Sequence, residues 1–185
     1  MSVHGEEMPD QSSGGCADLD VRQLNVCLRR LAEQYARVAS EVLGENLTSV
    51  YLFGSVARGE AGPESDIDLL VICRHLPEGA FRRRRVLEPI RERLTSHLQT
   101  LWDRGVYTDS VEVIRNETEA AKVHPLYLDM VNEAVRLFDR NGFFTHVLAR
   151  LAERLQALGA ERGRLGHVFY WDLKPDFRTG EVIEL

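Results

Sequence analysis

Residues 52–59 read LFGSVARG, and residues 65–71 read SDIDLLV. The first stretch closes a short run of β-branched and aromatic residues, which predicts a strand over 48–53 with a glycine–serine pair directly after it. The second stretch opens an apolar run, which predicts a strand over 66–73. The residues able to do chemistry therefore stand at the end of one strand and at the start of the next.

Apolar periodicity away from these two strands predicts the other elements. Steps of three and four between apolar residues indicate helices over 20–43, 80–103, a short stretch opened by His124-Pro125, and 144–158. Pro89 is expected to kink or divide the second of them. Further strands are expected over 109–115 and 134–139. This order predicts an α/β sandwich, in which helices pack against a mixed β-sheet.

The composition along the chain predicts how it is divided into domains. Residues 1–18 are polar and rich in Gly and Ser, and are expected to be disordered. One domain is expected over 19–140, with a C-terminal helix and tail, 141–185, packed on it. The tail from 160 onward carries no functional motif, and Trp171 is interpreted as a packing residue that anchors it, with stacking on a base or on a partner as the alternative.

Charge and cysteine content favour a cytoplasmic protein. The net charge of −6 argues against long nucleic acid as the main partner, because such binders usually carry an excess of positive charge. The three cysteines, an odd number without metal-ligand spacing, favour a reducing compartment. No apolar run approaches the roughly 20 residues that cross a bilayer, and the N-terminus lacks the pattern of a signal peptide.

Asp66 and Asp68 are the first candidates for catalysis and metal binding. Side chains two apart in a strand point to one face, which places the two Cα atoms roughly 7 Å apart. Two like charges at the start of a buried strand repel each other, and a divalent cation between them relieves that cost. Carboxylate oxygens suit Mg²⁺ or Mn²⁺. The alternative is a surface pair that begins a strand, which the upstream glycine and serine disfavour.

Gly54, Ser55, Arg58 and Ser65 are the candidate nucleotide-binding residues. Glycine lets the backbone approach a ligand, serine supplies a hydroxyl, and N–H groups at the start of a helical turn favour phosphate. Arg58 follows one turn later and is placed to reach the same phosphates, with a surface salt bridge as the alternative. For Ser65 a turn or cap role is slightly favoured. Metal and phosphate sites together are the minimum for phosphoryl or nucleotidyl transfer.

Glu112 is the candidate third carboxylate, as a metal ligand or a base. It lies inside the apolar strand predicted over 109–115, where a charge requires a reason. A structural acid is the alternative reading of Glu112. Asp109 is the alternative residue, although a solvated carboxylate is ordinary at the edge of a strand.

Gly54-Ser55, ten intervening residues and Asp66-Ile67-Asp68 resemble the signature of the DNA polymerase β-like nucleotidyltransferase superfamily, and the short chain resembles its minimal nucleotidyltransferases. The similarity covers 52–71 closely, and it is looser over 109–115 and the His-Pro segment. It implies the polymerase β-like fold, a divalent metal, and a third acidic residue at Glu112, where the family more often has Asp.

The leading hypothesis is an enzyme that moves a nucleoside monophosphate group from a nucleoside triphosphate, with ATP favoured, to an acceptor hydroxyl. Asp66, Asp68 and Glu112 would hold Mg²⁺ or Mn²⁺, and pyrophosphate would leave. The alternative is an antitoxin-like binding module that masks or modifies a small helical toxin, as some minimal nucleotidyltransferases do. A long apolar patch without a partner on the first or last helix would favour it. The sequence leaves the acceptor and the oligomeric state open.

Two other features of the sequence are interpreted as structural and are assigned no function. Residues 82–85 are four consecutive arginines, which point around most of a helix and form no single stripe, so they are read as a solvated helix start. His124, His146 and His167 share no metal spacing and are read as structural or surface residues.

Overall fold

The computed structural model describes residues 20–165, 168–178 and 181–183. The expectations for residues 1–18 and for His167 lie outside this part of the chain. Among the helices of the described part, none is long and apolar enough to cross a membrane.

A four-stranded mixed sheet lies at the centre of the molecule, in the order β3-β2-β1-β4. Strand β1 is antiparallel to β2 and to β4, whereas β2 and β3 run parallel. The mixed sheet and the helices that cover it agree with the predicted fold class. The strands are β1 (Leu47–Phe53), β2 (Ile67–Cys73), β3 (Ser110–Asn116) and β4 (Val135–Asp139).

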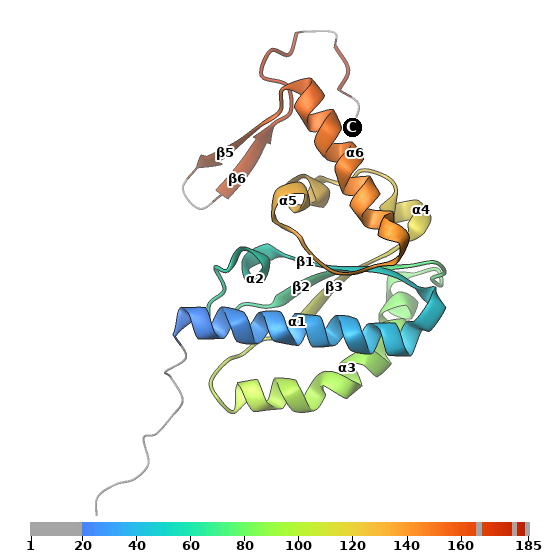
Figure 1. Cartoon of the computed structure of the whole chain (residues 1–185), viewed down its shortest axis with the longest axis vertical. Coiled ribbons are helices and arrows are strands. Elements are labelled where there is room, and N and C mark those ends of the chain that lie inside the picture. Colours follow the sequence, from blue (N-terminus) through green and yellow to red (C-terminus); the bar gives the residue numbers. More distant parts are fainter. Residues whose placement is uncertain (1–19, 166–167, 179–180, 184–185) are drawn as a thin grey trace, which may run out of the picture.

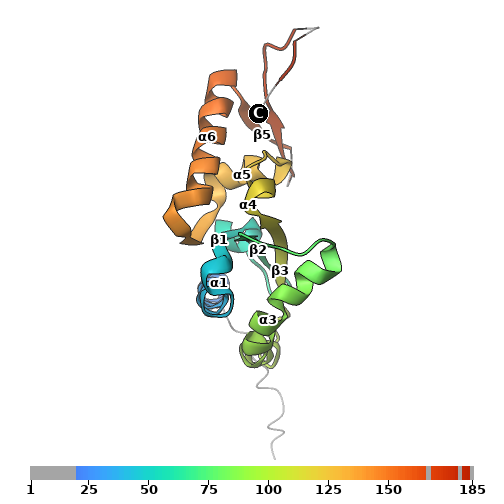
Figure 2. The ribbon, with the colours of Figure 1, turned by 90° about the vertical axis from the view of Figure 1, so that its right-hand side faces the viewer.

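Helices cover both faces of this sheet, which gives three layers (Figures 1 and 2). On one face lie α1 (Val21–Leu43) and α3 (Ala80–Trp102). On the other lie α4 (Glu117–Ala120), α5 (Pro125–Glu133) and α6 (Phe143–Leu158). The apolar stripe of α1 faces the sheet because its members recur at helical spacing, and they are buried: Leu24, Leu28, Leu31, Ala32, Tyr35, Ala36 and Ala39.

Strand β2 is buried on both faces and therefore separates two apolar clusters. Leu69 and Val71 join the cluster under α1 and α3. Leu70 and Ile72 join the cluster under α5 and α6. Alternate residues of a strand face opposite sides, so a strand with helices on both sides must be apolar throughout. The same alternation decides on which face of the sheet each candidate carboxylate lies.

The structure adds elements that periodicity does not predict. Helix α2 (Gly54–Arg58) follows β1, and short 3₁₀ turns occupy Gly44–Asn46 and Arg140–Gly142. The tail forms a hairpin of β5 (Glu161–Leu165) and β6 (Val168–Asp172). Pro89 lies inside α3 without dividing it, and the first part of α3 is directed away from the rest (Figure 2).

Trp171 anchors this tail hairpin, as the sequence predicts. Its indole Nε1 donates a hydrogen bond of 3.0 Å to Asp129 Oδ1 on α5. Its ring packs against the cluster under α5 and α6. The hairpin is therefore held to α5 by a side chain that is both apolar and a hydrogen-bond donor.

Candidate active site at the start of strand β2

The end of β1 and the start of β2 meet at Gly54, which begins α2 directly after Phe53. Antiparallel pairing sets Asp68 opposite Phe53, so the Asp68 carboxylate lies beside the next residue, Gly54. A Cβ atom at Gly54 would lie 2.1 Å from Asp68 Oδ2. Gly54 also has φ of +74°, a conformation that favours glycine. Position 54 is thus restricted both by backbone conformation and by the carboxylate against it.

Asp66 lies close enough to Asp68 to influence the charge of the Asp68 carboxyl group. Asp68 is partly buried and Asp66 is exposed. Burial raises the pKa of Asp68, the negative charge of Asp66 raises it further, and Arg58 lowers it. The Asp66 Oδ1 atom accepts a hydrogen bond of 3.2 Å from the Asp109 backbone N–H. The structure therefore brings together the two aspartates that the sequence pairs.

The two carboxylates fit a divalent cation that also binds substrate. No cluster of three or more His, Cys, Asp and Glu suited to a metal occurs within residues 20–165, 168–178 and 181–183. Mg²⁺, however, is commonly held by one or two carboxylates together with substrate phosphates and water. The glycine that leaves space for the Asp68 carboxylate, and the raised pKa of that carboxyl group, both suit a site in which a cation neutralises the pair.

Arg58 lies near this pair but is held by two acids. Its Nε donates to Glu60 Oε2 at 2.7 Å, and its Nη1 donates to Glu133 Oε2 at 3.3 Å. Glu133, on α5, also pairs with Arg162 of the tail hairpin. An ion-pair chain therefore connects α2 with α5 and with β5. Sequence analysis missed Glu133 and Arg162, because both lie far along the chain from Arg58 and belong to no motif.

The two candidate serines have different environments. Ser65 makes a turn: its Oγ accepts a hydrogen bond of 2.9 Å from the Gly62 N–H. This contact matches the turn role that the sequence slightly favours. Ser55 is the second residue of α2, next to Gly54, and its carbonyl oxygen accepts a hydrogen bond of 2.9 Å from the Glu60 N–H.

Glu112 is not brought to the aspartates. Parallel pairing sets it opposite Leu69, so its side chain faces α1 and α3, whereas Asp68 faces the opposite side of the sheet. Its carboxylate, which is 0% exposed, forms an ion pair with Arg91 of α3 and accepts a hydrogen bond of 2.8 Å from Ser110 Oγ. The expectation that Glu112 completes the metal site therefore lacks support in this geometry, and the structural-acid reading describes its contacts.

Asp109 lies next to Asp66 instead. Its backbone N–H donates to Asp66, while its own carboxylate oxygen Oδ1 accepts a hydrogen bond of 2.7 Å from the Ser110 N–H. The residue of β3 opposite Asp68 is Val111, which carries no acid. The only signal for this arrangement in the sequence is the alternation along β3, which puts Asp109 and Glu112 on opposite faces.

Comparison with known proteins identifies the family to which the chain is similar. The family model described as a nucleotidyltransferase domain matches residues 34–131, just over half of the chain. Two proteins of Methanocaldococcus jannaschii, each named "Putative protein adenylyltransferase", are similar in sequence. MJ1305 is 28% identical over 124 residues, 67% of this chain and 80% of that protein. MJ0141 is 36% identical over 47 residues, 25% of this chain and 48% of that protein.

Solved structures also show some likeness. A crystal structure of a toxin–antitoxin with AMP-PNP has 20% identity and a TM-score of 0.40, covering 66% of this chain and 90% of its own. A mutant of the toxin–antitoxin MntA–HpeT has 16% identity and a TM-score of 0.44, covering 69% of this chain and 88% of its own.

Proposed function

The chain belongs to the nucleotidyltransferase domain family, and we propose that it transfers a nucleoside monophosphate group from a nucleoside triphosphate to an acceptor hydroxyl. The observation that carries the proposal is the Asp68 carboxylate, seated against Gly54 and beside Asp66 at the start of β2. In our proposal, Asp66 and Asp68 hold Mg²⁺ or Mn²⁺. Glu112 is left out of the site because Arg91 binds it on the other face of the sheet.

Four residues have a defined part in this proposal. Gly54 leaves space at the end of β1, and Ser55 presents its hydroxyl and backbone to the triphosphate. Asp66 and Asp68 would hold the divalent cation, and the cation would supply neutralisation of the charge on the attacking and leaving oxygens. The acceptor hydroxyl gives up its proton to solvent as its oxygen forms a bond to the α-phosphorus. The bond from that phosphorus to the bridging oxygen breaks, and pyrophosphate leaves with its electron pair.

ATP and a protein hydroxyl are the substrates that we favour. Both relatives from Methanocaldococcus jannaschii carry the name of a protein adenylyltransferase. An adenylyltransferase takes its adenylyl group from ATP, and a protein acceptor supplies the hydroxyl of a side chain. The nucleotide and the acceptor are therefore inferred together from these relatives.

The antitoxin-like module stays a second candidate without a structural observation in its favour. A docking site for a helical toxin was expected as a long apolar patch on the first or last helix. Helix α6 exposes no large apolar side chain, and the exposed ones of the described α1, Val21 and Val26, lie near its start. The apolar faces of both helices are used inside the molecule.

Paired glycine variants test the proposed site directly. Gly54→Ala and Gly59→Ala both place alanine at a positive φ, +74° and +73°, but a Cβ at Gly59 has nothing within 4 Å. The positive φ alone is expected to cost each variant about 1 kcal/mol of unfolding free energy. Only Gly54→Ala should displace the Asp68 carboxylate, and it should weaken Mg²⁺–ATP binding about tenfold or more in titration calorimetry.

The matching activity assay supplies each of the four ribonucleotides labelled at the α-phosphate, with Mg²⁺ and a cell lysate. Label is expected in protein, from ATP above the other nucleotides, and excess EDTA should abolish the transfer. ATP binding and transfer that persist unchanged in EDTA, or equal ATP affinity for the Gly54 and Gly59 variants, would contradict the proposal.

A further inference from the structure

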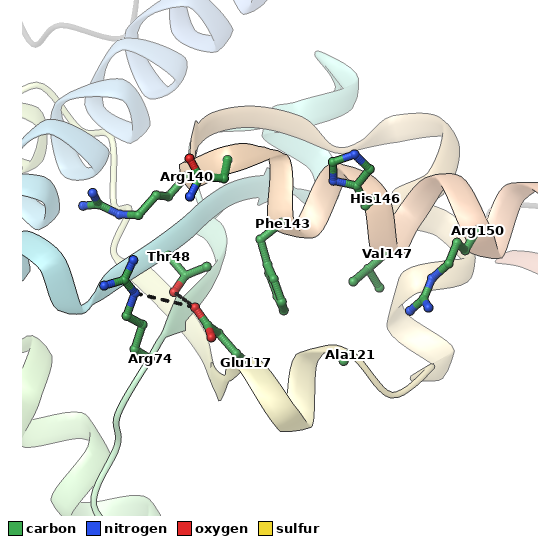
Figure 3. Close-up of a pocket in the computed structure, with 10 residues that line it drawn as sticks. Thr48, Arg74, Glu117, Ala121, Arg140, Phe143, His146, Val147 and Arg150 are labelled. Carbon is green, nitrogen blue, oxygen red and sulfur yellow. Dashed lines mark hydrogen bonds and ion pairs between the residues drawn. The ribbon is translucent and has the colours of Figure 1, made fainter.

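A cavity lies at the opposite end of the sheet from Asp66 and Asp68. Its volume is about 440 Å³, within the roughly 300–1,000 Å³ that is typical of small-molecule sites. Thr48 at the start of β1, Arg74 after the end of β2 and Glu117 at the start of α4 line one side. The start of α6 lines the other side (Figure 3).

Positive charge dominates the lining. Arg74, Arg140 and Arg150 line the cavity together with His146, and Glu117 is its one acid among the described residues. This concentration stands against a net charge of −6 for the whole chain. Guanidinium groups offer several N–H donors in a plane and match phosphate oxygens well.

The arginines of the cavity differ in the hydrogen bonds and ion pairs that they make within the protein. Arg140 is committed to the fold, because its side chain donates to the carbonyl oxygens of Leu47 and Gly44 and pairs with Glu45. Within the described residues, by contrast, the guanidinium of Arg150 makes no hydrogen bond or ion pair. Figure 3 shows the side chain of Arg150 extending from α6 toward α4, as the side chain of Phe143 also does. Arg150 is thus available to an anion inside the cavity.

The negative charge of Glu117 does not prevent the cavity from binding an anion. The Thr48 hydroxyl donates a hydrogen bond of 2.7 Å to Glu117 Oε1, and Arg74 Nε lies 3.9 Å from the same oxygen. These contacts hold the carboxylate on the Thr48 side, as Figure 3 shows. The remaining lining includes the apolar Phe143, Val147 and Ala121, a surface suited to the uncharged part of a ligand.

The cavity and the aspartate pair are separate sites. Strand β1 starts at the cavity, beside Thr48, and ends at Gly54. Its seven residues span about 20 Å. A ligand in the cavity therefore cannot contact a nucleotide at Asp66 and Asp68, and its binding requires no divalent cation.

We propose that this cavity binds a small anion that carries a phosphate group, such as a nucleoside monophosphate or pyrophosphate, with Arg150 and Arg74 as its cationic ligands. The proposal stands on the cavity and its unpaired cation, and it does not depend on the function proposed for the aspartates.

Calorimetric titration of the full chain in EDTA tests this site without metal, with AMP, pyrophosphate and adenosine as three probes. AMP or pyrophosphate should bind, while adenosine, which lacks the phosphate, should bind far more weakly. Arg150→Ala should weaken binding about tenfold or more, as expected for the loss of a charge-assisted hydrogen bond. Arg154→Ala removes an exposed arginine of the same helix outside the cavity lining and should leave binding unchanged.

Each result has a defined meaning. Binding of either anion that is lost in Arg150→Ala and kept in Arg154→Ala supports the site. Absence of binding by both anions, equal binding of adenosine, or an equal effect of the two arginine variants overturns it. A loss in Gly54→Ala as large as in Arg150→Ala would place the anion at the aspartates and would also overturn the proposal.

Discussion

Asp68 and Glu112 are acids on neighbouring strands, one residue apart in the pairing of β2 with β3, and yet their surroundings are opposite. The side chain of Glu112 is fully buried, and it has both a cation, Arg91, and a hydroxyl donor, Ser110. Asp68 lies on the other face, where the described residues give its carboxylate no hydrogen bond or ion pair and Asp66 repels it.

In our proposal, this difference separates a structural acid, Glu112, from an acid that binds a cation, Asp68. A buried charge requires a partner, and α3 supplies one to Glu112. No such partner neutralises Asp68, and the nearby Arg58 is bound to Glu60 and Glu133. In our proposal, a bound cation would neutralise Asp68 as Arg91 neutralises Glu112.

The largest effect is expected when Asp68 or Asp66 is changed to Asn. Transfer should fall about 10³-fold or more, mainly in kcat, because the bound cation stabilises charge that develops in the transition state. Without metal, each variant should melt at or above the temperature of the wild type, since the repulsion between the carboxylates is relieved. Transfer rates and metal-free thermal melts are measured on the same samples.

Lower melting temperatures with normal transfer would reverse this comparison, because Asp66 and Asp68 would then be the structural acids.

Glu112→Ala is expected to act on stability alone. It leaves Arg91 without its partner in a partly buried position and should lower the free energy of unfolding by about 3 kcal/mol. Glu41→Ala is the matched control, because the Glu41–Arg93 ion pair is exposed and should contribute less than about 1 kcal/mol. Denaturant unfolding measures both variants.

Transfer per folded molecule should be unchanged in Glu112→Ala. A loss of transfer activity as large as that of Asp68→Asn would mean that Glu112 reaches the metal site.

The smallest effect concerns pH. The pKa of Asp68 is raised above its ordinary value of 3.8, so the unfolded chain releases this proton at lower pH than the folded protein does. Metal-free wild type should therefore lose stability relative to Asp68→Asn as pH rises from 3.8 through the raised pKa, and the difference should stay constant above it. Denaturant unfolding of both proteins over this pH range measures the difference.

Mg²⁺ added near neutral pH should restore the stability of the wild type and not that of the variant. A stability difference that does not change with pH would show that burial and Asp66 do not act on Asp68 in this way.

Local pattern was sufficient for most of the fold. The helical stripe of α1 and the apolar runs of β1 and β2 depend on spacing within one element, and the structure confirms all of them. The tail hairpin was missed because β5 contains polar residues such as Arg162 and Arg164, and it is held by contacts with distant α5 instead of by its own apolar pattern.

The sequence by itself determined the pairing of Asp66 with Asp68 and its place after Gly54-Ser55, because these residues lie on adjacent elements joined by a short connection. Only the tertiary structure decided which third acid lies near them. The parallel register of β3 against β2 turns Glu112 toward Arg91 and brings Asp109 to Asp66. Register and the choice of face depend on how whole strands and helices pack, and the spacing of residues along one strand does not contain that information.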